Sequence, residues 1–253
     1  MSFTPAHRGG DGLPLVLLHG FLDTWRVWEL VLPALERSRD VLAPTLAGHA
    51  GGPPLRAVTD GALADAVEDA MDDAGFATAH IAGNSLGGHV AFQLAARGRA
   101  RSVIAFAPAG GWTDVLDQQV GMQEQARAAA PHAGALLATP AGRRRATELL
   151  TVNYEHIPVE LLAHQMLAVA GCTAAEAMIA NARRAGWPLE PERITCPVRI
   201  VWGTEDRLLP YPAAAERFRR ALPQADWVEL DGVGHYPQWD VPLETAQLIL
   251  GFT

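Results

Sequence analysis

The sequence predicts an α/β protein built on a mostly parallel sheet with helices on both faces. Short apolar runs alternate with longer segments whose apolar residues recur at helical spacing, as expected for parallel strands joined by crossover helices. The apolar runs are continuous and do not alternate with polar residues, so the strands are expected to be buried on both faces. With 253 residues, the chain has room for one large core and an inserted segment.

The strands are expected where short apolar runs end in loops. These runs cover residues 13–20, 40–51 (a strand and its loop), 79–85, 101–110, 196–206 and 225–235. Helical spacing of apolar residues predicts helices over 26–38, 59–75, 86–98 and 242–252. The helix over 59–75 is expected to begin at the capping residues Thr59 and Asp60 and to end at Gly75.

The interval from about residue 112 to residue 190 breaks this alternation. It contains the helical patterns DVLDQQVGMQEQARAAA and PVELLAHQMLAVA and no convincing strand. We therefore expect a helical insertion between the fourth and fifth strands. The chain is divided into a core of residues 1–111 and 191–253 and an inserted unit of residues 112–190.

The composition excludes several classes of protein. All 20 basic residues are arginine, so no lysine is present to bind pyridoxal phosphate or the phosphates of a nucleotide. The net charge is −8 and no basic run exceeds Arg143-Arg144-Arg145, which argues against a nucleic-acid partner. The two cysteines are too few for a disulfide framework, and the histidine spacings are not typical of zinc sites. We expect no metal in this protein.

The N-terminal region resembles neither a signal peptide nor a membrane span. Its apolar run, Leu13 to Leu18, is far too short to cross a bilayer, and it lacks a charged segment before it. We therefore expect a cytoplasmic protein without a membrane span. Nothing in the sequence indicates its oligomeric state.

The segment Gly83-Asn84-Ser85-Leu86-Gly87 matches the pattern G-x-S-x-G between a predicted strand and a predicted helix. This is the setting of a nucleophile elbow, a sharp turn that exposes a serine and leaves space only for small residues two positions away. The first N–H groups of the following helix then point toward the reacting atoms. We interpret Ser85 as a nucleophile.

A nucleophilic serine needs a base and an acid that orients the base. His235 follows the last predicted strand, and Asp206 follows the strand before it. The chain order Ser85, Asp206, His235 is the order expected for this arrangement of strands. Asp114, which follows the fourth strand, is an alternative acid.

Acyl transfer also requires donors for the oxyanion that develops on the carbonyl oxygen. One is expected to be the backbone N–H of Leu86, directly after the nucleophile. The other is expected in the loop after the first predicted strand, where Phe21 follows His19-Gly20. His19 itself is expected to shape this loop and not to carry protons.

Four motifs together resemble the α/β-hydrolase-fold serine hydrolases: HGF at 19–21, GNSLGG at 83–88, GTEDRLLP at 203–210 and GHYPQWDVP at 234–242. The resemblance implies a central, mostly parallel sheet, a helical cap over the site and no cofactor. It is strongest to a group that includes carboxylesterases, carbon–carbon bond hydrolases, perhydrolases and lactonases.

Two features of the sequence differ from what is usual among proteins of this fold: the segment before His19 is short, and the expected nucleophile is a serine where two groups of these enzymes have an aspartate. Only 18 residues precede His19, where such proteins usually have two antiparallel strands, so one strand is expected to be shortened or missing. Epoxide hydrolases and haloalkane dehalogenases of this fold use an aspartate nucleophile. Ser85 therefore argues against both activities.

The reaction expected from these residues is hydrolysis of small-molecule esters with small or medium apolar acyl groups. Residues expected at the substrate pocket are Trp112, Met166, Leu208 and Tyr236. Hydrolysis of a carbon–carbon bond in a diketone, or lactonase or perhydrolase activity, remains an alternative. A protein of this fold that senses a ligand without turnover is a further alternative.

Overall fold

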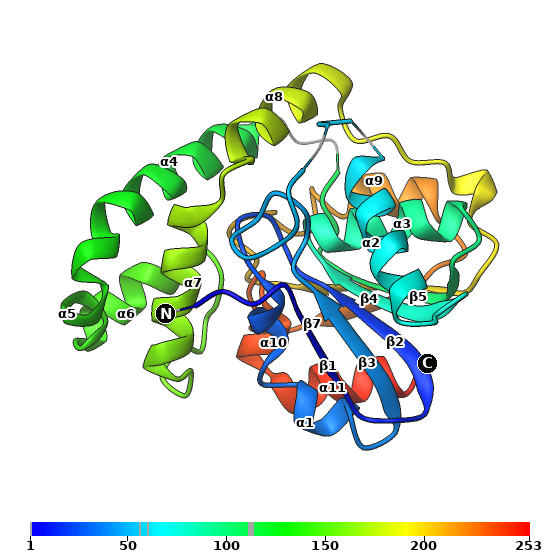
Figure 1. The fold of residues 1–253 in the computed structure, drawn as a ribbon, viewed down its shortest axis with the longest axis horizontal. Coiled ribbons are helices and arrows are strands. Elements are labelled where there is room, and N and C mark those ends of the chain that lie inside the picture. The colour runs from blue at the N-terminus through cyan, green and yellow to red at the C-terminus, as the bar shows by residue number, and fades with distance from the viewer. Residues whose placement is uncertain (1, 56, 60, 111–113) are drawn as a thin grey trace.

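The computed structural model describes residues 2–55, 57–59, 61–110 and 114–253 (Figure 1). Its centre is a seven-stranded sheet with the order β1-β3-β2-β4-β5-β6-β7, in which every neighbouring pair is parallel except β1 and β3. The six predicted strands are all present: β2 (Leu13–Leu18), β3 (Arg39–Pro44), β4 (Ala79–Asn84), β5 (Ala100–Phe106), β6 (Val198–Gly203) and β7 (Asp226–Leu230). The predicted fold class is confirmed.

The antiparallel strand at the edge of the sheet is β1 (Ala6–Gly9). The apolar pattern did not reveal it because its four residues are only partly buried and include His7 and Arg8. The Arg8 guanidinium donates to both carboxylate oxygens of Asp40 on β3, at 3.0 and 2.7 Å. In the described part of the chain, β1 is the only strand that precedes β2.

Helices cover both faces of the sheet and create two cores. Alternate residues of β2 point to opposite faces, so Val16 and Leu18 belong to one core and Leu15 and Leu17 to the other. The first core is completed by α2 (Ala62–Asp73), α3 (Leu86–Ala96) and α9 (Glu216–Ala221). The second is completed by α1 (Leu32–Leu35), α10 (Pro237–Asp240) and α11 (Pro242–Leu250).

The helix predicted over residues 26–38 is wrong as a continuous element. The structure has a 3₁₀ helix, η1 (Trp25–Trp28), and then the separate short helix α1. Pro33 lies in the first turn of α1, where its missing N–H is tolerated, whereas inside a longer helix it would remove a hydrogen bond.

The expected cap of the next helix is also wrong. Helix α2 begins at Ala62 with Gly61 as its N-cap and no side-chain capping bond, and Asp60 lies outside the described residues.

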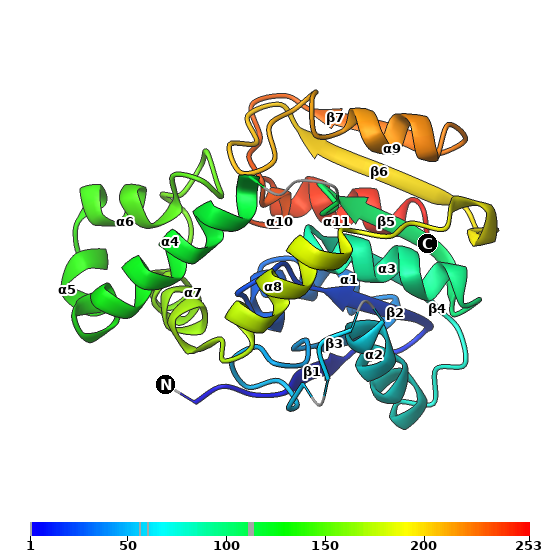
Figure 2. The same ribbon diagram turned by 90° about the horizontal axis from the view of Figure 1, so that it is seen from above.

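In the described residues between β5 and β6 there are five α-helices, which we call the inserted helices. They are α4 (Asp114–Ala129), α5 (Ala133–Leu137), α6 (Pro140–Thr147), α7 (Val159–Gly171) and α8 (Ala175–Ala185), with 3₁₀ turns η2 (Ala130–His132) and η3 (Pro191–Arg193). Figure 2 shows α4 to α7 as a lobe beside the core, while α8 returns across it. No strand occurs between residues 114 and 190.

No helix in the described ranges is by itself long and apolar enough to cross a membrane. The bent pair α7 and α8, at 69° to each other, reaches that length and composition only when the two helices are taken together.

Candidate active site

Ser85 occupies the turn between β4 and α3, as the sequence predicted. Its φ of 54° and ψ of −116° lie in a region that residues with a side chain rarely adopt. The Ser85 backbone N–H donates to the carbonyl of Phe106 at 2.9 Å, and the Ser85 carbonyl accepts from Ala109 N at 2.9 Å. The strained turn is thus fixed by the end of the adjacent strand β5.

Two glycines make this turn possible. A Cβ on Gly83 would overlap the carbonyl oxygen of Gly87, and a Cβ on Gly87 would overlap the carbonyl oxygen of Leu18 on β2. The close approach of α3 to two strands therefore requires residues without a side chain at both positions.

His235 and Asp206 form a buried hydrogen-bonded pair beyond the ends of β7 and β6. His235 Nδ1 lies 2.7 Å from Asp206 Oδ2, and Asp206 Oδ1 accepts from the N–H groups of Leu208 and Leu209 at 2.9 and 2.7 Å. Both carboxylate oxygens are thereby fixed. Within the described residues, His235 Nε2 has no hydrogen-bond partner, so it is the ring nitrogen available to exchange a proton. The side chain of Asp114, the alternative acid, lies outside the described part.

Asn84 joins the serine turn to the histidine loop. Its side-chain N–H₂ group donates to the carbonyl oxygens of His235 and Phe106, at 3.0 and 3.1 Å, and its Oδ1 accepts from Gln238 at 3.3 Å. The residue directly before the predicted nucleophile thus holds the backbone of the predicted base. The structure therefore brings these two loops together.

The loop after β2, which carries the predicted oxyanion donor Phe21, lies against the same turn. A Cβ on Gly20 would lie 3.4 Å from Ser85 Cβ and 3.6 Å from the Tyr236 hydroxyl. The other predicted donor, Leu86, is the first residue of α3, where backbone N–H groups have no partner inside the helix.

His19 has the shaping role that the sequence suggested. Its Nε2 accepts from the N–H of Leu46 at 2.8 Å, so the proton is on Nδ1, which donates to the Gly20 carbonyl at 2.7 Å. Burial holds the pKa of His19 well below its ordinary value, which keeps the ring neutral. Both ring nitrogens are used to hold the loop.

Asp23 is a buried acid that the sequence analysis did not single out. Only 2% of Asp23 is exposed, its Oδ2 accepts from the Tyr236 hydroxyl at 3.0 Å, and its Oδ1 accepts from Thr24 N at 2.7 Å. Burial raises the pKa of Asp23 from 3.8 to about 7, although both hydrogen bonds act in the opposite direction. A carboxylate two residues after the predicted donor Phe21 was the signal available in the sequence.

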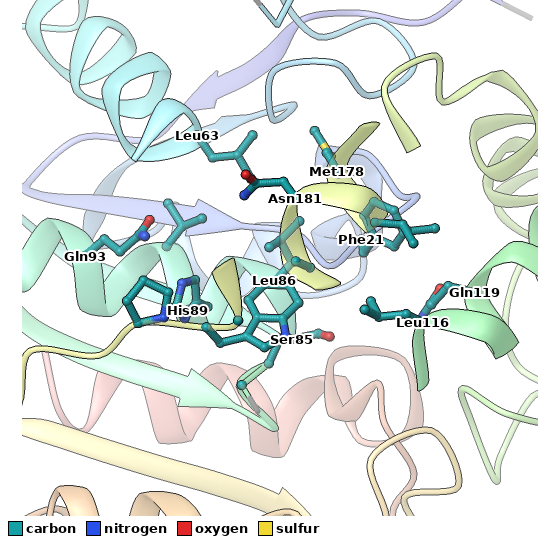
Figure 3. Close-up of a pocket in the computed structure, with 18 of the residues that line it drawn as sticks. Phe21, Leu63, Ser85, Leu86, His89, Gln93, Leu116, Gln119, Met178 and Asn181 are labelled. Carbon is teal, nitrogen blue, oxygen red and sulfur yellow. The ribbon is translucent and has the colours of Figure 1, made fainter. Parts of the chain in front are cut away.

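The pocket that contains Ser85 is lined mainly by apolar side chains (Figure 3). In that view, Gln93 and His89 lie toward one end, Leu116 and Gln119 toward the other, and Ser85 between them. Helix α3 contributes His89 and Gln93, which follow Ser85 by four and eight residues. Their spacing from the predicted nucleophile was the signal available in the sequence. Other parts of the wall come from the loop after β2, from α2, from the loop after β6 and from the inserted helices. They include Phe21, Leu63, Met178, Ile179 and Asn181.

The predicted pocket residues have different outcomes. Leu208 lines the pocket, whereas Met166 lines a second cavity because α7 packs against α4, α5 and α6 inside the lobe. Tyr236 is not among the residues that line this pocket, and its hydroxyl is bonded to Asp23. Trp112 lies outside the described residues.

The fold, the strained serine turn and the histidine–aspartate pair define a hydrolase of the α/β type. The chain belongs to the Alpha/beta hydrolase family, whose profile matches residues 15–248.

Similar proteins include the epoxide hydrolase EphH of Mycobacterium tuberculosis, 34% identical over 75% of this chain and 92% of that protein. The crystal structure of a membrane phospholipase A, described as a bacterial virulence factor, is 26% identical with a TM-score of 0.77. It covers all of this chain and 84% of that one. A thermophilic esterase from Thermogutta terrifontis shares the fold at 22% identity and a TM-score of 0.74, over 97% of this chain and 91% of that one.

Proposed function

We propose that this chain is a serine hydrolase that cleaves carboxylic esters of small or medium apolar acyl groups. The observation that carries the proposal is the buried His235–Asp206 hydrogen bond, which leaves His235 Nε2 without a partner among the described residues. This pair lies on loops that Asn84 links to the Ser85 turn. A nucleophile, an oriented base and a fixed acid are the groups that acyl transfer requires.

In the proposed reaction, Ser85 Oγ attacks the ester carbonyl while its proton passes to His235 Nε2. Asp206 stabilises the imidazolium and holds its Nδ1–H. The carbon–oxygen bond to the alcohol then breaks, and Nε2 returns the proton to the leaving alcohol. Water, deprotonated by His235, attacks the acyl-enzyme, and the acid leaves as Ser85 regains its proton.

The tetrahedral oxyanion is proposed to rest on the backbone N–H groups of Phe21 and Leu86. Removal of one such donor typically costs about 3–4 kcal/mol of transition-state stabilisation.

The inserted helices α4 and α8 are proposed to act as a cap, since Leu116 and Ile179 line the same pocket as Ser85. Because the pocket wall is mainly apolar, it favours binding of an apolar acyl group over a phosphate or a sugar.

Epoxide hydrolysis is the second candidate, because the relative EphH is named for that activity. The chemistry of the nucleophile distinguishes epoxide hydrolysis from ester hydrolysis. Opening of an epoxide by a carboxylate gives an ester that water can hydrolyse, whereas opening by Ser85 would give an ether that the same base cannot cleave. We therefore place ester hydrolysis first.

The proposal is tested with a panel of p-nitrophenyl esters, a lactone, a diketone and an epoxide, each measured with the wild type and Ser85→Ala. Ester turnover that falls at least about a thousandfold in Ser85→Ala supports it. Equal ester turnover by the wild type and Ser85→Ala would exclude Ser85 as the nucleophile. Cleavage of the diketone or the lactone without cleavage of esters would favour those alternatives, and saturable binding without any turnover would indicate a sensor.

A further inference from the structure

We infer that the lobe formed by α4 to α7 binds a small apolar carboxylate, whose charged group lies at Arg145 and Gln165 and whose apolar part lies among the helices. The site is the second cavity, which Met166 lines. The inference does not depend on the proposed ester hydrolysis. It rests on the walls of this cavity, on one buried carboxamide and on one arginine.

The second cavity is separate from the pocket that contains Ser85. Its volume is about 260 Å³, and no described residue lines both spaces. Along α4, Gln119 lines the pocket of Ser85, whereas Met122 lines the second cavity. The next residue, Gln123, is buried and donates to the Val169 carbonyl oxygen of α7 at 3.2 Å. This bond fastens α4 to α7 where one space gives way to the other.

The walls of the second cavity are mainly apolar and come from the four helices of the lobe (Figure 2). Helix α4 contributes Met122, Ala126 and Ala129, and α7 contributes Met166 and Val169. Methylene groups placed against such walls are stabilised because they leave water. A water molecule occupies about 30 Å³ in the liquid, so a space of about 260 Å³ holds roughly nine groups of that size. A chain of about seven carbons with one small polar group fits this volume.

Gln165 of α7 supplies a hydrogen-bonding group inside the lobe. Only 8% of Gln165 is exposed, it lines the cavity, and its side chain has no hydrogen-bond partner among the described residues. A buried carboxamide without a partner costs free energy, which a ligand oxygen that accepts from its N–H₂ group would recover. The cavity therefore offers a donor to an oxygen of the ligand.

Arg145 of α6 supplies a positive charge at the edge of the cavity. It is exposed, lines the cavity, and forms no ion pair with a described residue. No Asp or Glu is among the described residues that line the cavity. A guanidinium group binds a carboxylate through two parallel hydrogen bonds. An apolar molecule with one carboxylate thus matches the apolar walls, the donor and the cation together.

The cavity also touches the support of the histidine loop. Leu150 lines it, and the Leu150 carbonyl oxygen accepts from the N–H of Tyr236 at 2.9 Å. Tyr236 directly follows His235, the proposed base. A ligand in the lobe would therefore contact the segment that holds this loop.

The methionines of the chain allow binding to be assigned to one of the two spaces. Met122 and Met166 line the second cavity, whereas Met178 lines the pocket of Ser85. The experiment titrates octanoate into the chain labelled with ¹³C at its methionine methyl groups and follows their signals by NMR. The Met122 and Met166 signals should shift with one saturable Kd. A titration in which Met178 alone responds, or in which no signal shifts, would overturn the inference.

The two parts of the ligand are tested separately with the same signals. The Kd of octanoate should be at least fivefold lower than that of 1-octanol, because only the carboxylate can pair with Arg145. Acetate lacks the apolar chain and should bind at least a hundredfold more weakly than octanoate. If octanoate bound no more tightly than 1-octanol, or no more tightly than acetate, the inference would be wrong.

Arg145→Gln and Arg144→Gln form a matched pair, because both arginines are exposed on α6 and Arg144 does not line the cavity. Arg145→Gln should raise the Kd of octanoate at least fivefold and leave that of 1-octanol within twofold. A general disturbance of the lobe would change both values. Arg144→Gln should leave both within twofold of wild type. Equal effects of the two variants on octanoate would contradict the role of Arg145.

A second pair of variants fills the cavity. Ala129 lines it, whereas Ala128 is its exposed neighbour on α4 and does not. Ala129→Trp should abolish the octanoate response of Met122 and Met166, and Ala128→Trp should retain the wild-type Kd. An unchanged Kd in Ala129→Trp would place the ligand elsewhere and overturn the inference.

Discussion

The Tyr236 hydroxyl donates a 3.0 Å hydrogen bond to Asp23 Oδ2 and thereby joins the loop after β2 to the loop after β7. Both residues are buried, with 3% of Tyr236 and 2% of Asp23 exposed. Phe21, the predicted oxyanion donor, precedes Asp23 by two residues, and His235 directly precedes Tyr236. The bond therefore couples the positions of the proposed oxyanion site and the proposed base.

Asp23→Asn should change how stability depends on pH. The pKa of Asp23 is raised to about 7 in the folded chain from 3.8, so between these values the folded chain holds one more proton than the unfolded chain. Stability contributed at this site therefore falls as pH rises from about 4 to 7. Relative to wild type, Asp23→Asn should gain up to about 4 kcal/mol over this window, measured by urea unfolding.

The exposed Asp69 on α2 provides the control for this measurement. Asp69→Asn makes the same chemical change at an exposed position, and the gain between about pH 4 and 7 should be specific to Asp23→Asn. If the difference between Asp23→Asn and wild type does not vary with pH, the pKa of Asp23 is not raised in the folded chain and this account of the site is wrong.

Asp206→Asn should lower kcat for ester hydrolysis about a thousandfold or more and leave the fold intact. The amide has nearly the same shape, but it cannot stabilise an imidazolium on His235 as the carboxylate does. Asp114→Asn tests the alternative acid and should retain activity. If the two effects were reversed, Asp114 would be the acid.

Gly87→Ala should destabilise the chain by about 1–3 kcal/mol or more and reduce activity, because its Cβ would overlap the Leu18 carbonyl oxygen. The matched control is Gly121→Ala within α4, where a Cβ meets nothing within 4 Å. This control should be stabilised by about 1 kcal/mol, because alanine favours the helix. Thermal unfolding of both variants checks the contrast, and equal stability of Gly87→Ala and wild type would contradict it.

Asp240→Ala should weaken the attachment of the histidine loop to the loop between α6 and α7. The buried Asp240 carboxylate accepts from the N–H groups of Val152 and Asn153, at 2.9 and 2.7 Å, and of Gly234 at 2.7 Å. Loss of these bonds should cost about 2–4 kcal/mol in urea unfolding. Asp240→Asn keeps one acceptor oxygen and should lose less, so equal losses would be inconsistent with this role.

Sequence reasoning predicted the elements whose causes are local. The continuous apolar strands and the glycines around Ser85 are properties of neighbouring residues, and both were found where expected. The break of the 26–38 segment, which falls just before the helix turn that contains Pro33, also has a local cause, but the helical spacing of the apolar residues concealed it. Strand β1 was not predicted because pairing with β3, and not its own apolar content, defines it.

The remaining features depend on contacts between distant segments. Met166 lines the second cavity because α7 packs against other inserted helices. The spacing of apolar residues within α7 does not specify which helices those are. The Asp23–Tyr236 bond spans 213 residues of sequence. Likewise, the pocket residues Leu63 and Trp187 come from segments that only the folded chain brings beside α3.

The central claim, that Ser85 is an acylated nucleophile, is tested most directly by labelling the protein with a fluorophosphonate and locating the adduct by peptide mass spectrometry. The account predicts one adduct per chain, on Ser85, with ester hydrolysis lost in proportion to labelling and no adduct in Ser85→Ala. Full ester turnover by a chain whose Ser85 remains unmodified, or an adduct on another residue that accompanies loss of activity, would contradict it.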